Sequence, residues 1–164
     1  KGRCEVVPTG RDFTVVIDYA HTPDGLEKIC GALRECKTGR LVTVFGCGGD
    51  RDKTKRPKMG KAAAALSDFL VVTSDNPRSE DPQAIIDDIL AGLADSKTPY
   101  TVVANRVEAI RWAIHNAKSG DTILLAGKGH ETYQVLRDGI VHLDEREVVA
   151  EALAQMAPAA SADE

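Results

Sequence analysis

Four short polar segments each follow an apolar run of the chain, and their side chains are suited to binding a small charged molecule. They are residues 18–24, 46–52, 75–78 and 127–131. Arginine binds carboxylates and phosphates through paired hydrogen bonds, and carboxylates bind ammonium groups equally directly. A molecule with both charges would therefore find partners here. Asp75-Asn76-Pro77 is also common turn chemistry, so this segment alone does not establish a site.

The apolar runs predict the strands of an α/β domain. Continuous runs rich in β-branched residues occupy residues 13–17, 41–45, 69–73, 100–104 and 122–126, as is typical of strands buried on both faces. Helical spacing or alanine-rich composition predicts helices at residues 23–38, 59–66, 82–93, 107–114 and 145–156. An Asp138-Gly139 pair between two short apolar segments predicts a tight hairpin at residues 134–142. We expect a mostly parallel sheet of about six strands with helices on both faces.

In such a sheet the carboxyl ends of the strands lie on one edge, so we expect the four polar segments to converge on one crevice. Gly46-Cys47-Gly48-Gly49 would let a ligand approach backbone N–H groups closely. This glycine segment matches neither the G-x-G-x-x-G motif of dinucleotide-binding domains nor the G-x-x-x-x-G-K-S/T phosphate loop. We interpret Lys53, Lys55 and Lys58 as solvent-exposed residues at the start of the next helix.

Composition limits the classes of partner. The chain has 164 residues, 43% of them hydrophobic, and a formal net charge of -4, which disfavours a general nucleic-acid surface. Its apolar runs are too short for a membrane span, and residues 1–5 do not resemble a signal peptide. The four cysteines lack metal-ligand spacing, so we expect free thiols, no metal site and a cytoplasmic location. We expect a monomer, without nucleic-acid or membrane partners.

The four segments, in this order, resemble the successive signatures of the Mur ligases. The resemblance extends from Gly2 to about Leu153 and is greatest to the members that add meso-diaminopimelate to UDP-N-acetylmuramoyl-L-alanyl-D-glutamate in peptidoglycan synthesis. Mur ligases have three domains, and this chain resembles only the C-terminal, Rossmann-like domain that brings the amino acid. We therefore assign residues 1–156 to that domain and residues 157–164 to a frayed tail. We expect the N-terminal UDP-sugar domain and the central ATPase domain to be absent from this chain.

The resemblance also implies site residues. Those implied to bind meso-diaminopimelate are Arg51, Asp75, Asn76, Pro77, Arg78, Gly127 and Glu131. Arg78 is expected to select this substrate, because lysine lacks the far carboxylate that a guanidinium would bind. Three further residues, Arg3, Asp18 and His21, are implied to contact ATP at the boundary with the central domain. No role is assigned to Lys128 or His130, and no catalytic residue is expected in this chain.

In the family, ATP with Mg²⁺ converts the substrate carboxylate into an acyl phosphate, which the incoming amine attacks. Because ATP and Mg²⁺ are bound mainly by the central domain, we expect this chain alone to be inactive. A hinge is expected near its N-terminus. One alternative is a stand-alone module that binds diaminopimelate or a related amino acid. The start at Lys1 without an initiator methionine favours a domain of a longer protein. An unrelated nucleotide-binding domain would need a phosphate loop, which the sequence lacks.

Overall fold

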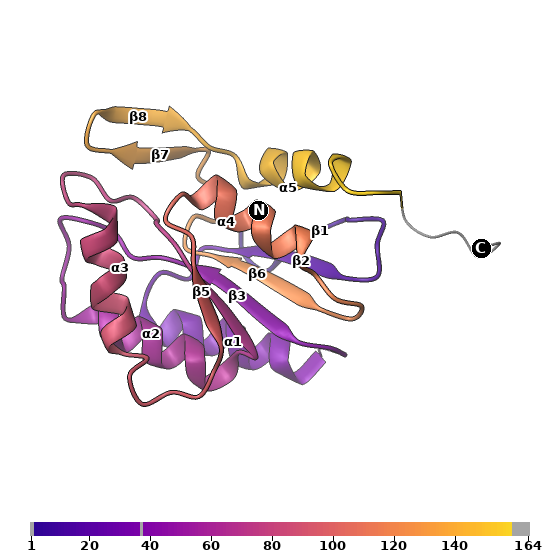
Figure 1. Cartoon of the computed structure of the whole chain (residues 1–164), viewed down its shortest axis with the longest axis horizontal. Helices are drawn as coiled ribbons and strands as arrows, with labels where there is room; N and C mark the ends of the chain where they lie inside the picture. The colour runs from indigo at the N-terminus through magenta and orange to yellow at the C-terminus, as the bar shows by residue number, and fades with distance from the viewer. Residues whose placement is uncertain (1, 37, 159–164) are drawn as a thin grey trace.

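The computed structural model of the chain describes residues 2–36 and 38–158, and shows one twisted sheet flanked by helices, with a hairpin at one end (Figure 1). The predicted tail falls mostly outside these residues: residues 159–164 are not described. Helix α5 ends at Ala154, so residues 157 and 158 follow it without regular structure. None of the described helices combines the length and apolar character needed to cross a membrane.

The sheet has the strand order β1-β2-β6-β3-β4-β5, and only β1 runs antiparallel to its neighbour. The strands are β1 (Glu5–Val7), β2 (Thr14–Asp18), β3 (Leu41–Phe45), β4 (Phe69–Val72), β5 (Tyr100–Val102) and β6 (Thr122–Ala126). Every residue of β3 and β6 is buried, as expected of central parallel strands covered on both faces.

Five helices cover the two faces. They are α1 (Pro23–Cys36), α2 (Lys55–Leu66), α3 (Pro82–Ala91), α4 (Arg106–His115) and α5 (Glu145–Ala154). The apolar residues of α1, α2 and α3 form one core cluster with one face of the sheet, and those of α4 and α5 form a second cluster on the opposite face. Thr22 caps α1, because its Oγ1 accepts a hydrogen bond of 3.0 Å from the Gly25 N–H.

The hairpin, β7 (Tyr133–Leu136) and β8 (Gly139–His142), forms a separate two-stranded sheet. Its strands are joined by Arg137-Asp138, since Leu136 is paired with Gly139. Figure 1 shows it beyond the end of the main sheet, next to the segment that follows β4. Backbone and side-chain bonds join the two: the Arg78 N–H donates to the Val135 carbonyl at 3.0 Å, and Gln134 Nε2 donates to the Asp75 carbonyl at 2.7 Å.

The predicted α/β fold, with its mostly parallel six-stranded sheet, is confirmed; several element ends shift by one or two residues, and two differences are larger. Strand β1 was not predicted, because three residues with partial exposure show no clear pattern and are held by antiparallel pairing with β2. Helix α2 begins at Lys55, four residues before the predicted start, since Pro57 is tolerated within a first turn.

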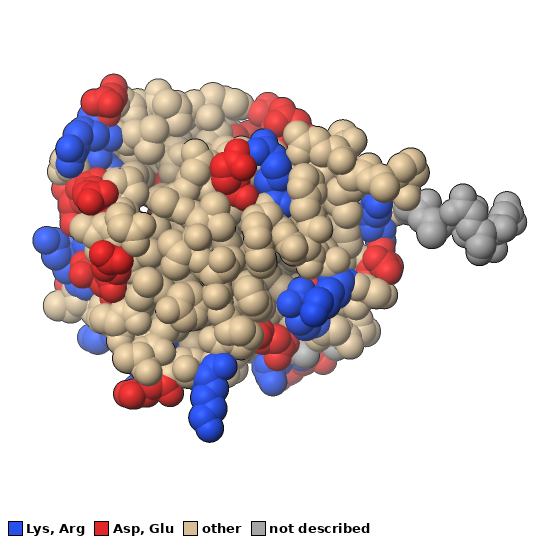
Figure 2. Space-filling model, in the orientation of Figure 1, with Lys and Arg blue, Asp and Glu red and all other residues tan. Residues whose placement is uncertain are grey.

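Charged side chains of both signs are dispersed over the face seen in Figure 2.

Candidate functional site

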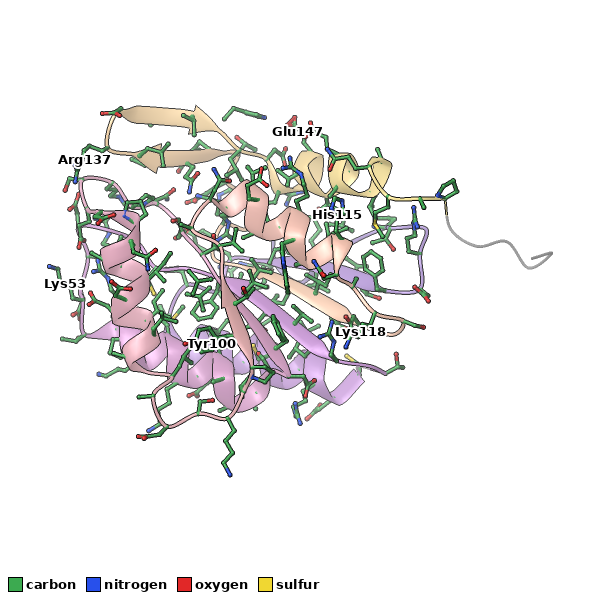
Figure 3. The ribbon with its side chains drawn as sticks, viewed as in Figure 1. Lys53, Tyr100, His115, Lys118, Arg137 and Glu147 are labelled. Carbon is green, nitrogen blue, oxygen red and sulfur yellow. The ribbon has the colours of Figure 1, made fainter. Side chains whose placement is uncertain are left out.

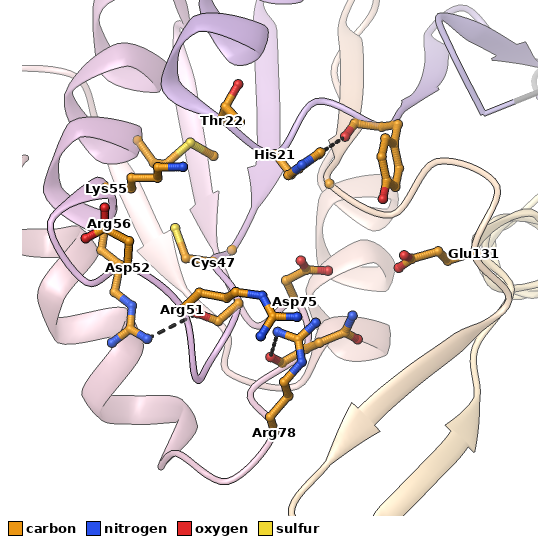
Figure 4. Close-up of a pocket in the computed structure, with 16 residues that line it drawn as sticks. His21, Thr22, Cys47, Arg51, Asp52, Lys55, Arg56, Asp75, Arg78 and Glu131 are labelled. Atoms are coloured by element: carbon orange, nitrogen blue, oxygen red, sulfur yellow. Dashed lines mark hydrogen bonds between the residues drawn. The ribbon is translucent and has the colours of Figure 1, made fainter.

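A pocket of about 420 Å³ opens at the carboxyl edge of the sheet, and all four polar segments contribute to it (Figure 4). Tyr19, His21 and Thr22 line it from the segment after β2, and Gly127 and Glu131 line it from the segment after β6. Its remaining walls come from the segment after β3, from α2, and from residues 75, 76 and 78. The crevice expected from strand order is therefore present.

The structure brings most of the predicted site residues together. Those that line the pocket are Arg51, Asp75, Asn76, Arg78, Gly127, Glu131 and His21. Pro77 does not, and instead lines a neighbouring groove beside the hairpin. Arg3 and Asp18 also lie outside the pocket lining.

Asp18 is occupied by the chain's own backbone. Its two carboxylate oxygens accept hydrogen bonds from the N–H groups of Cys4, at 2.6 Å, and Ala20, at 2.9 Å. These bonds tie the N-terminal segment to the end of β2. His21 lies at the pocket rim, with its Nδ1 2.9 Å from the Tyr19 carbonyl, so this nitrogen is the one that carries the proton.

Two arginines supply positive charge to one wall. Arg78 has a backbone φ of 54°, in the left-handed region, and its Nη1 donates to the Gly49 carbonyl at 2.9 Å. Arg51 is exposed, and its Nη1 donates to the Asp50 carbonyl at 3.0 Å. Among the ion pairs of the described residues, neither guanidinium is joined to a carboxylate. Both charges therefore remain available to an anionic ligand.

The glycine segment 46–49 corrects one prediction. We expected its open backbone to receive a ligand, but at two glycines the neighbouring chain fills that space. A Cβ on Gly49 would lie 1.8 Å from the Pro77 carbonyl oxygen, and one on Gly46 would lie 2.3 Å from the Thr73 carbonyl oxygen. The Gly49 N–H also donates to the Asn76 carbonyl at 2.8 Å. The absence of side chains at Gly46 and Gly49 lets the Asp75–Arg78 turn pack closely against this segment. Gly48 lines the pocket, and a Cβ there would meet the Arg78 side chain.

Two acidic side chains of the pocket, Asp75 and Glu131, lie against a buried lysine to which the sequence assigned no role. Lys128 is completely buried, and its Nζ donates to Asn76 Oδ1 at 2.7 Å and to the Tyr133 carbonyl at 3.0 Å. The same Nζ lies 3.4 Å from Asp75 Oδ1 and 3.6 Å from Glu131 Oε1. Burial lowers the pKa of Lys128, and the two carboxylates act in the opposite direction. Its only sequence signal is its place between two glycines after a buried strand.

Arg56 is a second buried cation that the sequence did not distinguish from its basic neighbours. Lys53, Lys55 and Lys58 are exposed as predicted, and Lys53 lies at the periphery of the molecule (Figure 3). Arg56 is 1% exposed instead, and donates to Glu80, Asp88 and the Gly48 carbonyl.

The bond with Arg56 is the main reason that the pKa of Glu80 falls to about 2.

The chemistry available to the pocket is binding and orientation. The described residues contain no group of three or more histidine, cysteine, aspartate or glutamate side chains that could hold a metal ion. Cys47 also lines the pocket, but burial is the main cause that raises the pKa of its thiol to about 12, so it remains protonated. The arrangement suits a molecule with a carboxylate and an ammonium group close together.

Comparison with known proteins identifies the family of the chain. A family model described as "Mur ligase, glutamate ligase domain" matches residues 2–129. The chain belongs to the Mur ligase family. The resemblance expected from residues 18–24, 46–52, 75–78 and 127–131 is thereby confirmed.

Individual Mur ligases resemble the chain over almost its whole length. The UDP-N-acetylmuramoyl-L-alanyl-D-glutamate--2,6-diaminopimelate ligase of Caldanaerobacter subterraneus subsp. tengcongensis is 57% identical over 155 residues, which are 94% of this chain and 32% of that protein. The ligase of the same name from Syntrophomonas wolfei is 57% identical over 153 residues, 93% of this chain and 31% of that protein. A solved structure of a ligase of this name superposes with a TM-score of 0.86 at 38% identity, covering 94% of this chain and 31% of that one. The chain thus spans about a third of these relatives.

Proposed function

We propose that this chain is the amino-acid-binding domain of a ligase that adds meso-diaminopimelate to UDP-N-acetylmuramoyl-L-alanyl-D-glutamate. The observation that carries the proposal is the presence in one pocket of two arginines, Arg51 and Arg78, and two carboxylates, Asp75 and Glu131. The relatives that carry this name are more than half identical to the chain. The predicted site residues fit the same substrate.

Each end of meso-diaminopimelate is an amino acid, so its far carbon carries both a carboxylate and an ammonium group. We propose that Arg78, helped by Arg51, binds the far carboxylate through paired hydrogen bonds. The far ammonium would then meet Glu131, Asp75 and the Gly127 carbonyl. Lysine has the ammonium but lacks the carboxylate, and its binding would leave Arg78 without a partner.

For the complete ligase we propose ATP and Mg²⁺ as cofactors. The described residues do not fit a Mg²⁺ site, because they hold no cluster of acidic or histidine ligands. We therefore assign Mg²⁺, and most contacts to ATP, to the part of the ligase outside this chain. Arg3, Asp18 and His21 are proposed to reach ATP only when the domains close, and Asp18 is the least free of them because its carboxylate already binds two backbone N–H groups.

The contribution of this chain to the reaction is then to hold the far end of the amino acid and to present its other amine to the activated carboxylate of the dipeptide. Fixing two reactants in a favourable geometry removes much of the entropic cost of an encounter in solution. We propose that the complete enzyme is a cytoplasmic monomer.

Calorimetric titration of the chain with meso-diaminopimelate and with L-lysine tests the substrate. We expect diaminopimelate to bind at least about tenfold more tightly, the equivalent of about 1.4 kcal/mol. If neither binds, the same pair of amino acids is compared as substrates of the full-length ligase. Equal use of the two would contradict the proposal.

A turnover assay separates the proposal from a stand-alone binding module. The chain is incubated with ATP, Mg²⁺, diaminopimelate and the UDP-linked dipeptide, and phosphate release is measured beside the full-length ligase. We expect turnover only by the full-length protein. Ligation by the chain alone would contradict the assignment of ATP and Mg²⁺ to other domains, and a full-length protein that binds diaminopimelate without turnover would favour the module.

A further inference from the structure

Asp75 and Glu131 belong to a network of five charged groups, which extends beyond the residues assigned to the substrate. Lys128, Arg106 and Glu145 have completely buried side chains, whereas Asp75 and Glu131 are 14% and 17% exposed. Arg106 Nε donates to Glu145 Oε2 at 2.8 Å, and its other nitrogens donate to the carbonyls of Ser74 and Ala126. Arg106 thus holds the ends of the two strands that precede Asp75 and Gly127.

The charges of this network do not cancel. It contains two cations, Lys128 and Arg106, and three carboxylates, so one negative charge is in excess. Arg106 is neutralised directly by Glu145, which leaves Lys128 with the two carboxylates that line the pocket. Unbalanced charge in a poorly hydrated site is costly unless a partner of opposite charge is supplied. A single ammonium group in the pocket would supply it.

We propose that Lys128 is a positioning residue of the amino-acid site: its buried ammonium keeps Asp75 and Glu131 ionised together, so that the three groups present one net negative charge to the far ammonium of the substrate. This inference deepens the proposed function and rests on it for the identity of the ligand. Without Lys128, two neighbouring carboxylates would repel each other, and one of them would take up a proton more readily.

The contacts of Lys128 support positioning as well as neutralisation. Asn76 Oδ1 accepts from both Lys128 Nζ and the Val135 N–H, at 2.7 Å and 3.0 Å. Lys128 also reaches the Tyr133 carbonyl, and its Nζ lies 5.9 Å from the centre of the Tyr133 ring. One side chain therefore joins the turn after β4, the segment after β6 and the start of the hairpin. The charged groups that face it from these elements and from α4 and α5 are Asp75, Glu131, Arg106 and Glu145.

The first test needs no ligand. Carboxyl ¹³C signals of Asp75 and Glu131 are followed by NMR against pH in the chain, in Lys128→Met, and in Lys53→Met, a matched change at a lysine that is 71% exposed. We expect one carboxyl of Lys128→Met to titrate about one pH unit or more above its wild-type midpoint, with no change in Lys53→Met. Unchanged midpoints in Lys128→Met would overturn the inference.

If Lys128→Met does not fold, the interaction between Lys128 and the carboxylates is measured by changing a carboxylate instead. Glu131→Gln removes a carboxylate at the pocket wall, and the titration of the Lys128 ammonium is followed through its ¹³Cε signal. We expect its midpoint to move to lower pH, because the ammonium loses a partner that favours its charged form. A midpoint that stays in place would overturn the inference.

The second test uses meso-diaminopimelate. At about pH 4.5 we expect Lys128→Met to bind it several-fold more weakly than wild type, with the difference shrinking as the pH rises to about 7 and both carboxylates ionise. A purely structural role predicts a loss that does not vary with pH, and that result would contradict the proposal. Carboxyl midpoints that move as expected, together with a wild type that binds no diaminopimelate in either the chain or the full-length ligase, would overturn the proposed substrate and leave the role of Lys128 standing.

Discussion

Arg56 and Arg78 donate to adjacent carbonyls of the same glycine segment, and yet their surroundings differ. Arg56 Nη2 reaches the Gly48 carbonyl at 3.1 Å, while Arg78 Nη1 reaches the Gly49 carbonyl at 2.9 Å. Arg56 is 1% exposed and paired with two carboxylates. Arg78 is half-buried, and within residues 2–36 and 38–158 its side chain bonds only to carbonyls. The comparison separates an arginine that stabilises the segment from one whose charge is left for a ligand. A basic run in a sequence does not reveal this difference.

Arg56→Met is the change with the largest expected effect. It leaves Glu80 and Asp88 without their shared cation, and breaking a buried ion pair in this way costs about 3–5 kcal/mol of stability. We expect about 3 kcal/mol, because the Asp88 side chain is 45% exposed and remains hydrated. Urea unfolding followed by circular dichroism measures the loss, with Lys58→Met as the control at an exposed position of the same helix. A loss of unfolding free energy no larger than that of Lys58→Met would contradict a stabilising role for Arg56.

Arg78→Ala should show the reverse pattern. Folding loses the bond to the Gly49 carbonyl and the longer one to the Asn76 carbonyl, together worth about 1 kcal/mol. Binding of meso-diaminopimelate loses a charge-assisted contact worth about 1.5–3 kcal/mol. Calorimetry and, in the full-length ligase, the KM for diaminopimelate measure the second effect. Arg34→Ala serves as the control, since Arg34 is an exposed arginine on α1 that lies outside the pocket lining. Diaminopimelate binding that is equal in the two variants would remove Arg78 from the site.

The ion pair between Arg56 and Glu80 should also make the stability of the chain depend on pH, whereas Arg78 has no carboxylate partner among the described residues. The pKa of Glu80 is lowered from 4.5 to about 2, chiefly by its bond with Arg56. A lowered carboxyl pKa stabilises the folded state above the unfolded value, and this contribution is lost as the pH falls toward 2. We expect the difference in thermal midpoint between wild type and Glu80→Gln to be constant above about pH 5 and to narrow below pH 4.5. A difference that does not change down to pH 2.5 would contradict this account.

The sequence predicted the parts of this site that depend on local pattern. Buried strands, the loops at their carboxyl ends and the family resemblance all follow from residues that are near one another in the chain. The buried charges do not: Arg56 finds partners 24 and 32 residues away, and Lys128 finds Asn76 at a separation of 52. Because a charged residue is ordinarily exposed, only the folded arrangement shows that these partners make burial possible. The bond from the Cys4 N–H to Asp18, across 14 residues, is likewise visible only in the folded chain.

Gly48→Ala should have the smallest effect on diaminopimelate affinity, and it tests whether the position of the Arg78 guanidinium matters. A Cβ at this position would lie 2.9 Å from Arg78 Nη1, which is the mobile end of a side chain, so the guanidinium can move aside at little cost to folding. We expect a several-fold loss of diaminopimelate affinity, less than about 1 kcal/mol, as Arg78 leaves its position beside the Gly49 carbonyl.

Gly31→Ala is the matched control for this change, because nothing lies within 4 Å of a Cβ there. A double-mutant cycle then decides whether Gly48 acts through Arg78. If it does, Gly48→Ala will have no further effect on affinity once Arg78 is alanine. Additive losses would instead mean that Gly48 contacts the ligand itself, and would divide the cationic wall between two independent contributions.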